Sequence, residues 1–232
     1  MANEYEYEIE KLAKEESWRM FRIIGEFVEG FDSLTGIEPA VTVYGSARVK
    51  EDGPLWAQTE DIAYRLGQKG FSIITGGGPG VMAAANSGAR KAGVPSIGLN
   101  IELPEEQVLN PYTTKSITFH HFFVRKVMLA KYATAFVIMP GGLGTLDELS
   151  EILTLMQTEK IRPFPVILFD RTYWQGLLEW LHNTVMAKGN ISHEDMTLLR
   201  VVDSPDEVIE TVQRWYRKHE VSGKQVFDVT DV

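Results

Sequence analysis

Short apolar runs alternate with longer stretches of helical periodicity along most of the chain. The runs are expected to form buried parallel strands, at residues 40–44, 71–75, 95–99, 135–139, 166–169 and 199–202. Strands that alternate with helices build right-handed βαβ units. The pattern therefore predicts an α/β fold: a Rossmann-like, doubly wound parallel sheet with helices on both faces.

Local signals support this division into elements. Gly70 and Gly93 lie just past predicted helices, where a left-handed residue is favoured. Ser204, Pro205 and Glu207 form an N-cap, a first-turn proline and a capping-box glutamate.

Two segments lie outside the alternating pattern. Residues 5–31 predict one extra helix before the first strand, which could pack on the flank of the sheet or serve a dimer. Residues 100–116 show little periodicity and are expected to form a long functional or interfacial loop. We expect residues 1–232 to form a single nucleotide-binding domain.

Composition and charge limit the kinds of binding partner that we expect for this chain. The formal net charge of −9 makes the chain a poor candidate for binding nucleic acid. The sequence contains no cysteine, which excludes disulfides, thiolate zinc sites and a cysteine nucleophile, and suits the cytoplasm. The acidic first ten residues do not resemble a secretory signal, and no apolar run approaches the roughly 18 residues of a membrane span. We expect a cytoplasmic protein without nucleic-acid or membrane partners.

The turn after the first predicted strand contains Gly45, Ser46 and Arg48. Ligands of open α/β sheets bind beyond the carboxyl ends of the strands, where this hydroxyl and guanidinium could bind an anion. An ordinary turn with a solvated arginine would explain the same residues.

A glycine-rich loop separates the second predicted strand from its helix and contains Gly76, Gly77, Gly78 and Gly80. Without side chains at these positions, backbone N–H groups and the positive end of the helix dipole can approach a phosphate. A tight turn that needs positive φ explains one or two glycines but not four. We expect this loop to bind phosphate or ribose.

A second glycine-rich loop, with Gly141, Gly142 and Gly144, leads to Thr145 and Glu148. Thr145 and Glu148 have the spacing of a capping box, which would explain both without a ligand. It would not explain three glycines. A carboxylate beside a phosphate loop could instead orient a water molecule or a ribose hydroxyl, and both interpretations can hold.

Between the two loops, a strand end runs into a helix that carries the adjacent cations Arg125 and Lys126. They could face a ligand or form a solvated basic surface. Phe122 and Phe123 are expected in the core, although one could stack on a base.

The neighbouring His120 and His121 are expected to point apart, as adjacent residues do on regular structure. With no metal-binding motif, we expect no metal site.

A dinucleotide site is the main competing hypothesis. Gly78, Gly80 and Ala83 fit the G-x-G-x-x-G/A fingerprint, and Glu102 follows near the spacing of a ribose-binding acid. However, that fingerprint belongs after the first strand of the fold, and here it follows the second. Two glycine loops facing each other suit a compact phosphorylated ribose, so we expect a nucleoside 5′-monophosphate and no cofactor.

The run from Pro140 to Glu148 matches the PGGxGTxxE signature of the LOG (Lonely Guy) family, which is also labelled as lysine decarboxylases. Residues 76–82 and 123–128 look like two further blocks of that family, and the similarity extends over residues 39–215. A decarboxylase would need a pyridoxal phosphate lysine in a recognisable setting, and no lysine stands out.

The resemblance implies a Rossmann-like fold, usually a dimer, with phosphoribohydrolase activity, and we expect a homodimer or a higher homo-oligomer. Water would cleave the N-glycosidic bond of AMP or a cytokinin riboside monophosphate, releasing the base and ribose 5-phosphate. The family's catalytic arginine and glutamate fall on Arg125 and Glu148, and its binding residues fall on Lys126 and the glycines of both loops. Relatives that carry a nucleotide-like cofactor without hydrolysing it provide an alternative.

These roles are chemically reasonable for the residues concerned. Glu148 could stabilise an oxocarbenium-like state and activate water. Arg125 could hold the phosphate or neutralise charge on the leaving group, and the sequence leaves both roles open. In one departure from the family pattern, Ala83 stands where many relatives of this longer form have glutamate.

Overall fold

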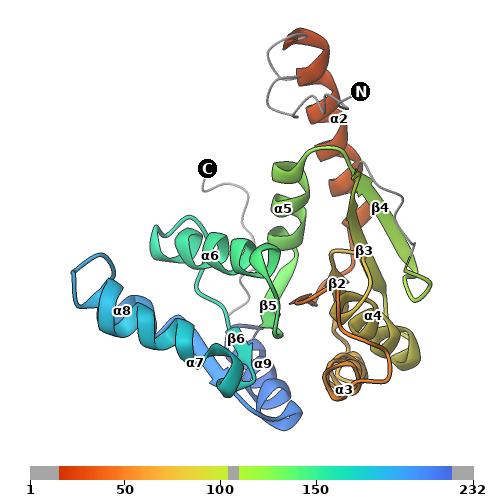
Figure 1. The fold of residues 1–232 in the computed structure, drawn as a ribbon. Coiled ribbons are helices and arrows are strands. Elements are labelled where there is room, and N and C mark those ends of the chain that lie inside the picture. Colours follow the sequence, from red (N-terminus) through yellow and green to blue (C-terminus); the bar gives the residue numbers. More distant parts are fainter. Residues whose placement is uncertain (1–15, 104–109, 221–232) are drawn as a thin grey trace, which may run out of the picture.

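The computed structural model describes residues 16–103 and 110–220. At its centre is one parallel sheet with the strand order β4-β3-β2-β1-β5-β6-β7 (Figure 1). The strands are β1 (Ala40–Tyr44), β2 (Ser72–Thr75), β3 (Ser96–Ile101), β4 (Lys115–Phe119), β5 (Ala133–Ile138), β6 (Val166–Phe169) and β7 (Leu199–Val202).

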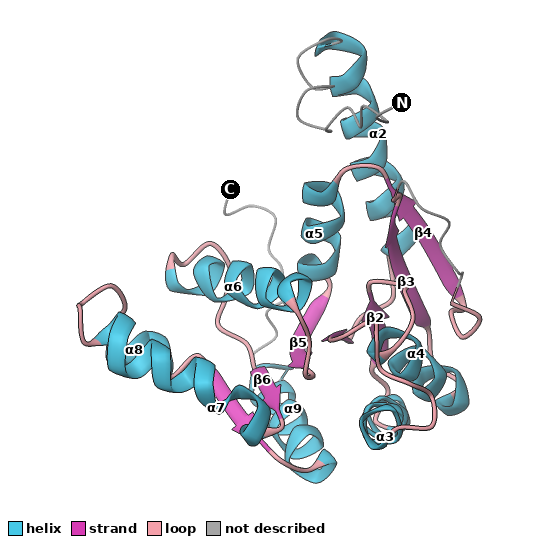
Figure 2. Cartoon of the chain, viewed as in Figure 1, coloured by secondary structure: helices cyan, strands magenta, loops and turns pink. Residues whose placement is uncertain are grey.

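Helices connect these strands and cover both faces of the sheet (Figure 2). They are α2 (Glu16–Leu34), α3 (Pro54–Gln68), α4 (Val81–Ala92), α5 (Phe122–Lys131), α6 (Leu143–Gln157), α7 (Arg171–Trp180), the π-helix η1 (Leu181–Met186), α8 (His193–Met196) and α9 (Pro205–Glu220). The expected α/β class is confirmed.

The side chains of β1 alternate between two buried apolar layers. Val41 and Val43 pack in a cluster with residues of α3, α4 and α9. Ala40 and Tyr44 belong to the opposite cluster, with residues of α2, α5 and α6. Because β1 is covered on both faces, all its residues are buried, as a central parallel strand requires.

The strand order reverses beside β1. The chain runs outward from β1 to β4 and then returns to place β5 on the other side of β1. Backbone hydrogen bonds join the two carboxyl ends: Ser46 N–H donates to Pro140 O at 3.0 Å, and Met139 N–H donates to Tyr44 O at 2.8 Å. This is the switch point at which open α/β sheets bind ligands.

The predicted strands are all present, with small shifts at their ends. Of the long loop expected at residues 100–116, residues 100 and 101 instead end β3 and residues 115 and 116 begin the edge strand β4, so those parts of the loop prediction are wrong. In β4 only Ile117 and Phe119 are buried, and their neighbours are exposed. The apolar signal of this strand is therefore weak.

The signals at helix ends are confirmed. Gly70 and Gly93 adopt positive φ angles of 87° and 77°. Ser204 N–H donates to Glu207 Oε2 at 3.1 Å, which is one bond of the expected capping box. The predicted first helix reaches Leu34 rather than residue 31, and residues 5–15 of that prediction lie outside the described residues.

Candidate active site

Three loops meet at the switch point, and the backbone of Ser46 joins them. Its N–H donates to Pro140 O before the second glycine loop, and its carbonyl accepts from Val81 N–H at 3.0 Å, directly after the first. Its hydroxyl accepts from Arg48 N–H at 3.1 Å, which shapes the turn itself. The turn after β1 therefore lies between the two glycine loops.

The fold requires two glycines of the first loop. Gly77 has a φ of +73°, and a Cβ there would lie 2.2 Å from Asn100 Oδ1. Gly80 has a φ of +67°, and its Cβ would lie 2.4 Å from Ser46 O. At Gly45 a Cβ would press on the Val81 side chain at 2.6 Å.

The other two glycines of the first loop make room for side chains. A Cβ at Gly76 would lie 2.3 Å from Nη2 of Arg125, and one at Gly78 would lie 2.7 Å from Cε of Met82. The missing Cβ of Gly76 thus lets the Arg125 guanidinium reach the first loop.

The glycines of the second loop are also of two kinds, one in close contact with the fold and two without such contacts. Gly141 is packed, because a Cβ there would lie 2.1 Å from Thr145 Oγ1, and its carbonyl accepts from Tyr173 O–H at 2.7 Å. A Cβ at Gly142 or Gly144 would meet nothing within 4 Å. No packing among the described residues explains these two glycines.

The capping-box interpretation of Thr145 and Glu148 is wrong. Helix α6 begins three residues earlier, with Gly142 as its N-cap and no side-chain cap. Gly142 O accepts from Leu146 N–H at 3.0 Å, so Thr145 already lies inside the first turn. Both side chains are buried, which leaves the Glu148 carboxylate free of a capping role.

Glu148 is a buried carboxylate with an incomplete set of hydrogen bonds. It is 7% exposed, and its Oε2 has no hydrogen-bond partner among the described residues. Burial raises its pKa to about 7, against the opposing charges of Lys126 and Arg125. Near neutral pH Glu148 therefore populates both its protonated and its ionised form, and can act as an acid or a base.

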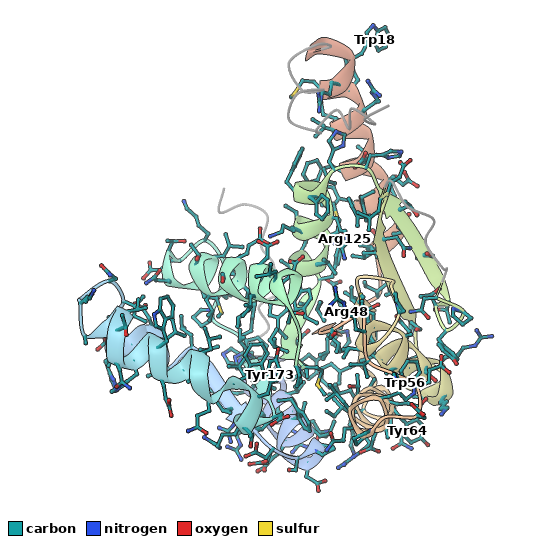
Figure 3. The ribbon with its side chains drawn as sticks, viewed as in Figure 1. Trp18, Arg48, Trp56, Tyr64, Arg125 and Tyr173 are labelled. Carbon is teal, nitrogen blue, oxygen red and sulfur yellow. The ribbon has the colours of Figure 1, made fainter. Side chains whose placement is uncertain are left out.

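Arg125 lies on α5 within the electrostatic reach of Glu148 (Figure 3). Its Nε–H donates to Leu99 O at 2.7 Å, which ties the guanidinium to the backbone of β3. Burial lowers the pKa of Arg125, while Glu148 and Tyr44 act to raise it. The structure thus brings together the two residues on which the family's catalytic pair falls.

Lys126 clamps α5 to α6. Its Nζ lies 2.8 Å from Asp147 Oδ2 and 3.1 Å from Glu151 Oε2. Burial acts to lower the pKa of Lys126, but the hydrogen bond to Asp147 and the nearby glutamates produce a net increase. The solvated-face interpretation is wrong for this lysine.

Arg48 differs from these buried cations. It is exposed, and its guanidinium makes no hydrogen bond or ion pair with the described part of the chain. A side chain with this freedom at the switch point can close on an anionic ligand.

A buried polar network behind the first loop has no counterpart in the sequence predictions. Thr75 Oγ1 accepts from Gly77 N–H at 3.0 Å and donates to Asn86 Oδ1 at 2.6 Å. Asn110 Nδ2–H donates to Asn86 Oδ1 at 2.9 Å and reaches Gly78 O at 3.3 Å. An asparagine inside the alanine-rich helix α4 was the available signal. The network links the backbone of the first glycine loop to α4.

The two histidines converge rather than point apart. His120 Nδ1 and His121 Nδ1 lie 3.2 and 2.9 Å from the same Glu26 oxygen, and His120 Nε2 lies 2.8 Å from Glu102 Oε2. The prediction assumed regular structure, but these residues form the turn between β4 and α5. Glu102 is thereby engaged with His120.

Two further expectations concern the start of α5 and the metal site. Phe122 and Phe123 are 44% and 45% exposed, so their placement in the core was wrong. Among the described residues, no three His, Asp or Glu side chains are grouped to hold a metal ion.

A parallel α/β sheet with two glycine-rich loops at its switch point defines a Rossmann-like protein. This chain belongs to the family described as "Possible lysine decarboxylase", the LOG family, whose model matches residues 82–212.

Relatives with assigned names support the family. The chain is 28% identical over 179 residues to the cytokinin riboside 5′-monophosphate phosphoribohydrolase of Mycobacterium tuberculosis, covering 73% of this chain and 90% of that protein. It is 29% identical over 186 residues to an Arabidopsis thaliana protein named for the same activity, covering 75% and 84%.

Solved structures share the fold. The molybdenum cofactor carrier protein of Chlamydomonas reinhardtii aligns with a TM-score of 0.57 and 21% identity, over 77% of this chain and 98% of that one. The molybdenum cofactor binding protein of Rippkaea orientalis aligns with a TM-score of 0.55 and 22% identity, over 75% and 94%. Within the described ranges, none of the helices is long and apolar enough to span a membrane.

Proposed function

We propose that this chain hydrolyses the N-glycosidic bond of a nucleoside 5′-monophosphate, of the AMP or cytokinin riboside type, to a free base and ribose 5-phosphate. The observation that carries the proposal is Glu148, a buried carboxylate near a glycine loop and within electrostatic range of Arg125, with one oxygen that has no hydrogen-bond partner among the described residues. The names of the phosphoribohydrolase relatives support it.

Each part of the site has a task in this reaction. The backbone of the glycine loops and the positive ends of α4 and α6 bind the phosphate. Glycosidic cleavage develops positive charge at the anomeric carbon, which the Glu148 carboxylate stabilises while it takes a proton from water. Arg125 neutralises negative charge, either on the phosphate or on the departing base.

Product analysis tests the proposal. The wild-type protein is incubated with a panel of nucleoside monophosphates, and released base is measured. We expect Glu148→Gln to lose about 10²–10⁴-fold in rate, because an amide cannot act as the general base. AMP affinity should be retained. The matched control is Glu179→Gln, which changes an exposed carboxylate on α7. Turnover of Glu148→Gln within about threefold of wild type contradicts the role of Glu148.

A carrier that binds a nucleotide-like cofactor without hydrolysing it is the second candidate. The fold shared with molybdenum cofactor carrier proteins is the observation in its favour. It predicts tight binding with no release of base from any nucleotide in the panel.

An NAD site is less well supported. Its fingerprint follows β2 instead of β1, and its expected ribose-binding acid, Glu102, is paired with His120. Calorimetric titration separates the candidates, since we expect AMP to bind more tightly than NAD.

We also propose that the chain acts as a homodimer. Helix α2 exposes Phe21, Ile24, Val28 and Phe31 along one side, and α5 exposes further apolar residues next to it. An exposed apolar surface of this kind is typical of an interface.

A further inference from the structure

The side chain of Tyr44 ends beside the catalytic pair. Tyr44 is the last residue of β1 and is 6% exposed, with its ring stacked on Phe136 at 5.9 Å and an interplanar angle of 9°. The ring belongs to the apolar cluster formed with α5 and α6, the helices that carry Arg125 and Glu148.

The polar end of this side chain is unsatisfied. Tyr44 Oη has no hydrogen-bond partner among the described residues. Burial raises the pKa of Tyr44 well above its usual range, the nearby Glu148 charge adds to this rise, and Arg125 acts to lower it. The phenol therefore keeps its proton.

Glu148 Oε2 also lacks a partner in the described structure, so two buried and unsatisfied oxygens belong to side chains within electrostatic range of each other. Buried polar groups in proteins are nearly always hydrogen-bonded, and buried water commonly bridges such groups. A phenylalanine would stack on Phe136 equally well, so packing does not explain the hydroxyl.

We propose that Tyr44 positions the attacking water of the hydrolysis by holding it between its hydroxyl and Glu148 Oε2. This inference rests on the proposed function. One water proton points to Glu148 and the other to the Tyr44 oxygen, which leaves a lone pair free for the anomeric carbon.

The step is balanced. The water oxygen bonds to the anomeric carbon, the bond to the base nitrogen breaks, and its electron pair leaves with the base. Glu148 takes one proton from the water, and this proton finally binds the base nitrogen where the glycosidic bond was. Tyr44 stays neutral throughout, and no other reactant is required.

The substitution Tyr44→Phe on the full chain tests this role. It removes one oxygen atom and keeps the ring. Because misplacing a reacting group slows a reaction by up to about 100-fold, we expect kcat to fall roughly 10- to 100-fold. KM for the nucleotide should stay within about twofold, since the hydroxyl holds water and not the substrate. The control is Tyr132→Phe, another buried tyrosine, whose hydroxyl lies 3.4 Å from Phe31 O.

Two kinetic outcomes overturn the proposal. An unchanged kcat means that the hydroxyl positions nothing. A raised KM with unchanged kcat places it on the nucleotide instead.

A high-resolution crystal structure of the wild-type protein gives a readout independent of turnover. We expect an ordered water within hydrogen-bond distance of both Tyr44 Oη and Glu148 Oε2, and its absence overturns the proposal. If the wild-type protein releases no base from any nucleotide, the proposed function fails. The crystal structure then still decides whether these two oxygens hold water.

Discussion

At the scale of single residues, the buried charge of Glu148 acts against the stability of the fold. Burial opposes its charge, and the nearby cations offset this cost only in part, so its pKa is raised to about 7. The folded protein holds a proton on Glu148 at pH values where the unfolded chain has already released it. Raising the pH through this window therefore favours unfolding.

The pH dependence of stability tests this directly. The folded pKa of about 7 lies above the ordinary value of 4.5, so ionised Glu148 destabilises the fold by up to about 3 kcal/mol once the pH exceeds 7. Relative to wild type, the unfolding free energy of Glu148→Gln should rise by this amount between pH 4 and pH 8. Denaturant titrations at several pH values measure it, with Glu179→Gln as the control. A difference that does not vary with pH contradicts the burial of this charge.

At the scale of elements, the glycines of the two loops fall into two groups. Gly76, Gly77, Gly78, Gly80 and Gly141 are required by positive φ or by close contacts within the fold. Gly142 and Gly144 face open space at the start of α6. The first group shapes the loops, and we assign the second group to the approach of the ligand.

Gly144→Ala separates these roles. Alanine suits a helix better than glycine, so the variant should be more stable by up to about 1 kcal/mol. If the phosphate approaches the backbone here, the added methyl group should weaken AMP binding by about tenfold or more.

Gly176→Ala in α7 is a matched control, because its Cβ also meets nothing within 4 Å. It should gain stability without loss of affinity. Equal AMP affinity in both variants would exclude the ligand role of Gly144.

The elements also show what the sequence could predict. Buried strands such as β1 and β6 were placed correctly, because a strand covered on both faces is a continuous apolar run. The edge strand β4 has only two buried residues and was partly assigned to a loop. The start of α6 was misplaced because Thr145 and Glu148 have the spacing of a capping box, whereas Gly142 begins the helix.

For the site, the resemblance to the family predicts Arg125 and Glu148, and the structure places the two charges within electrostatic range of each other. The contacts of His120 and His121 with Glu26 could not be predicted. They depend on how a turn meets a helix that lies 95 residues earlier in the chain. Similarly, only the fold reveals that Tyr44 O–H has no hydrogen-bond partner in the described part of the chain.

At the scale of the whole molecule, the strand order brings the candidate site residues to one edge of the sheet. Placing β5 beside β1 joins the two glycine loops through Ser46. Helix α2 lies outside this arrangement, and its first turns project beyond the rest of the described structure (Figure 1). Helix α2 contacts α5, and its Ile23 and Phe27 pack against the buried cluster that includes residues of α5. A neighbouring stripe of α2 is apolar but exposed.

The exposed side of α2 has the spacing of a helix-pairing seam. Phe21, Ile24, Val28 and Phe31 follow each other at intervals of three, four and three residues, and are 67%, 51%, 52% and 37% exposed. This is the a/d pattern of a coiled coil, and the same seam on a second copy provides a matching partner. We therefore expect the wild-type protein to sediment at twice the 26.1 kDa of one chain at micromolar concentration. The double substitution Phe21→Glu with Val28→Glu places two charges in the seam and should yield a 26.1 kDa species that remains folded. Trp180→Glu, at an equally exposed aromatic residue on α7, should leave the dimer intact. A wild-type protein that sediments only as a monomer, or a double variant that stays dimeric, shows that α2 is not the interface.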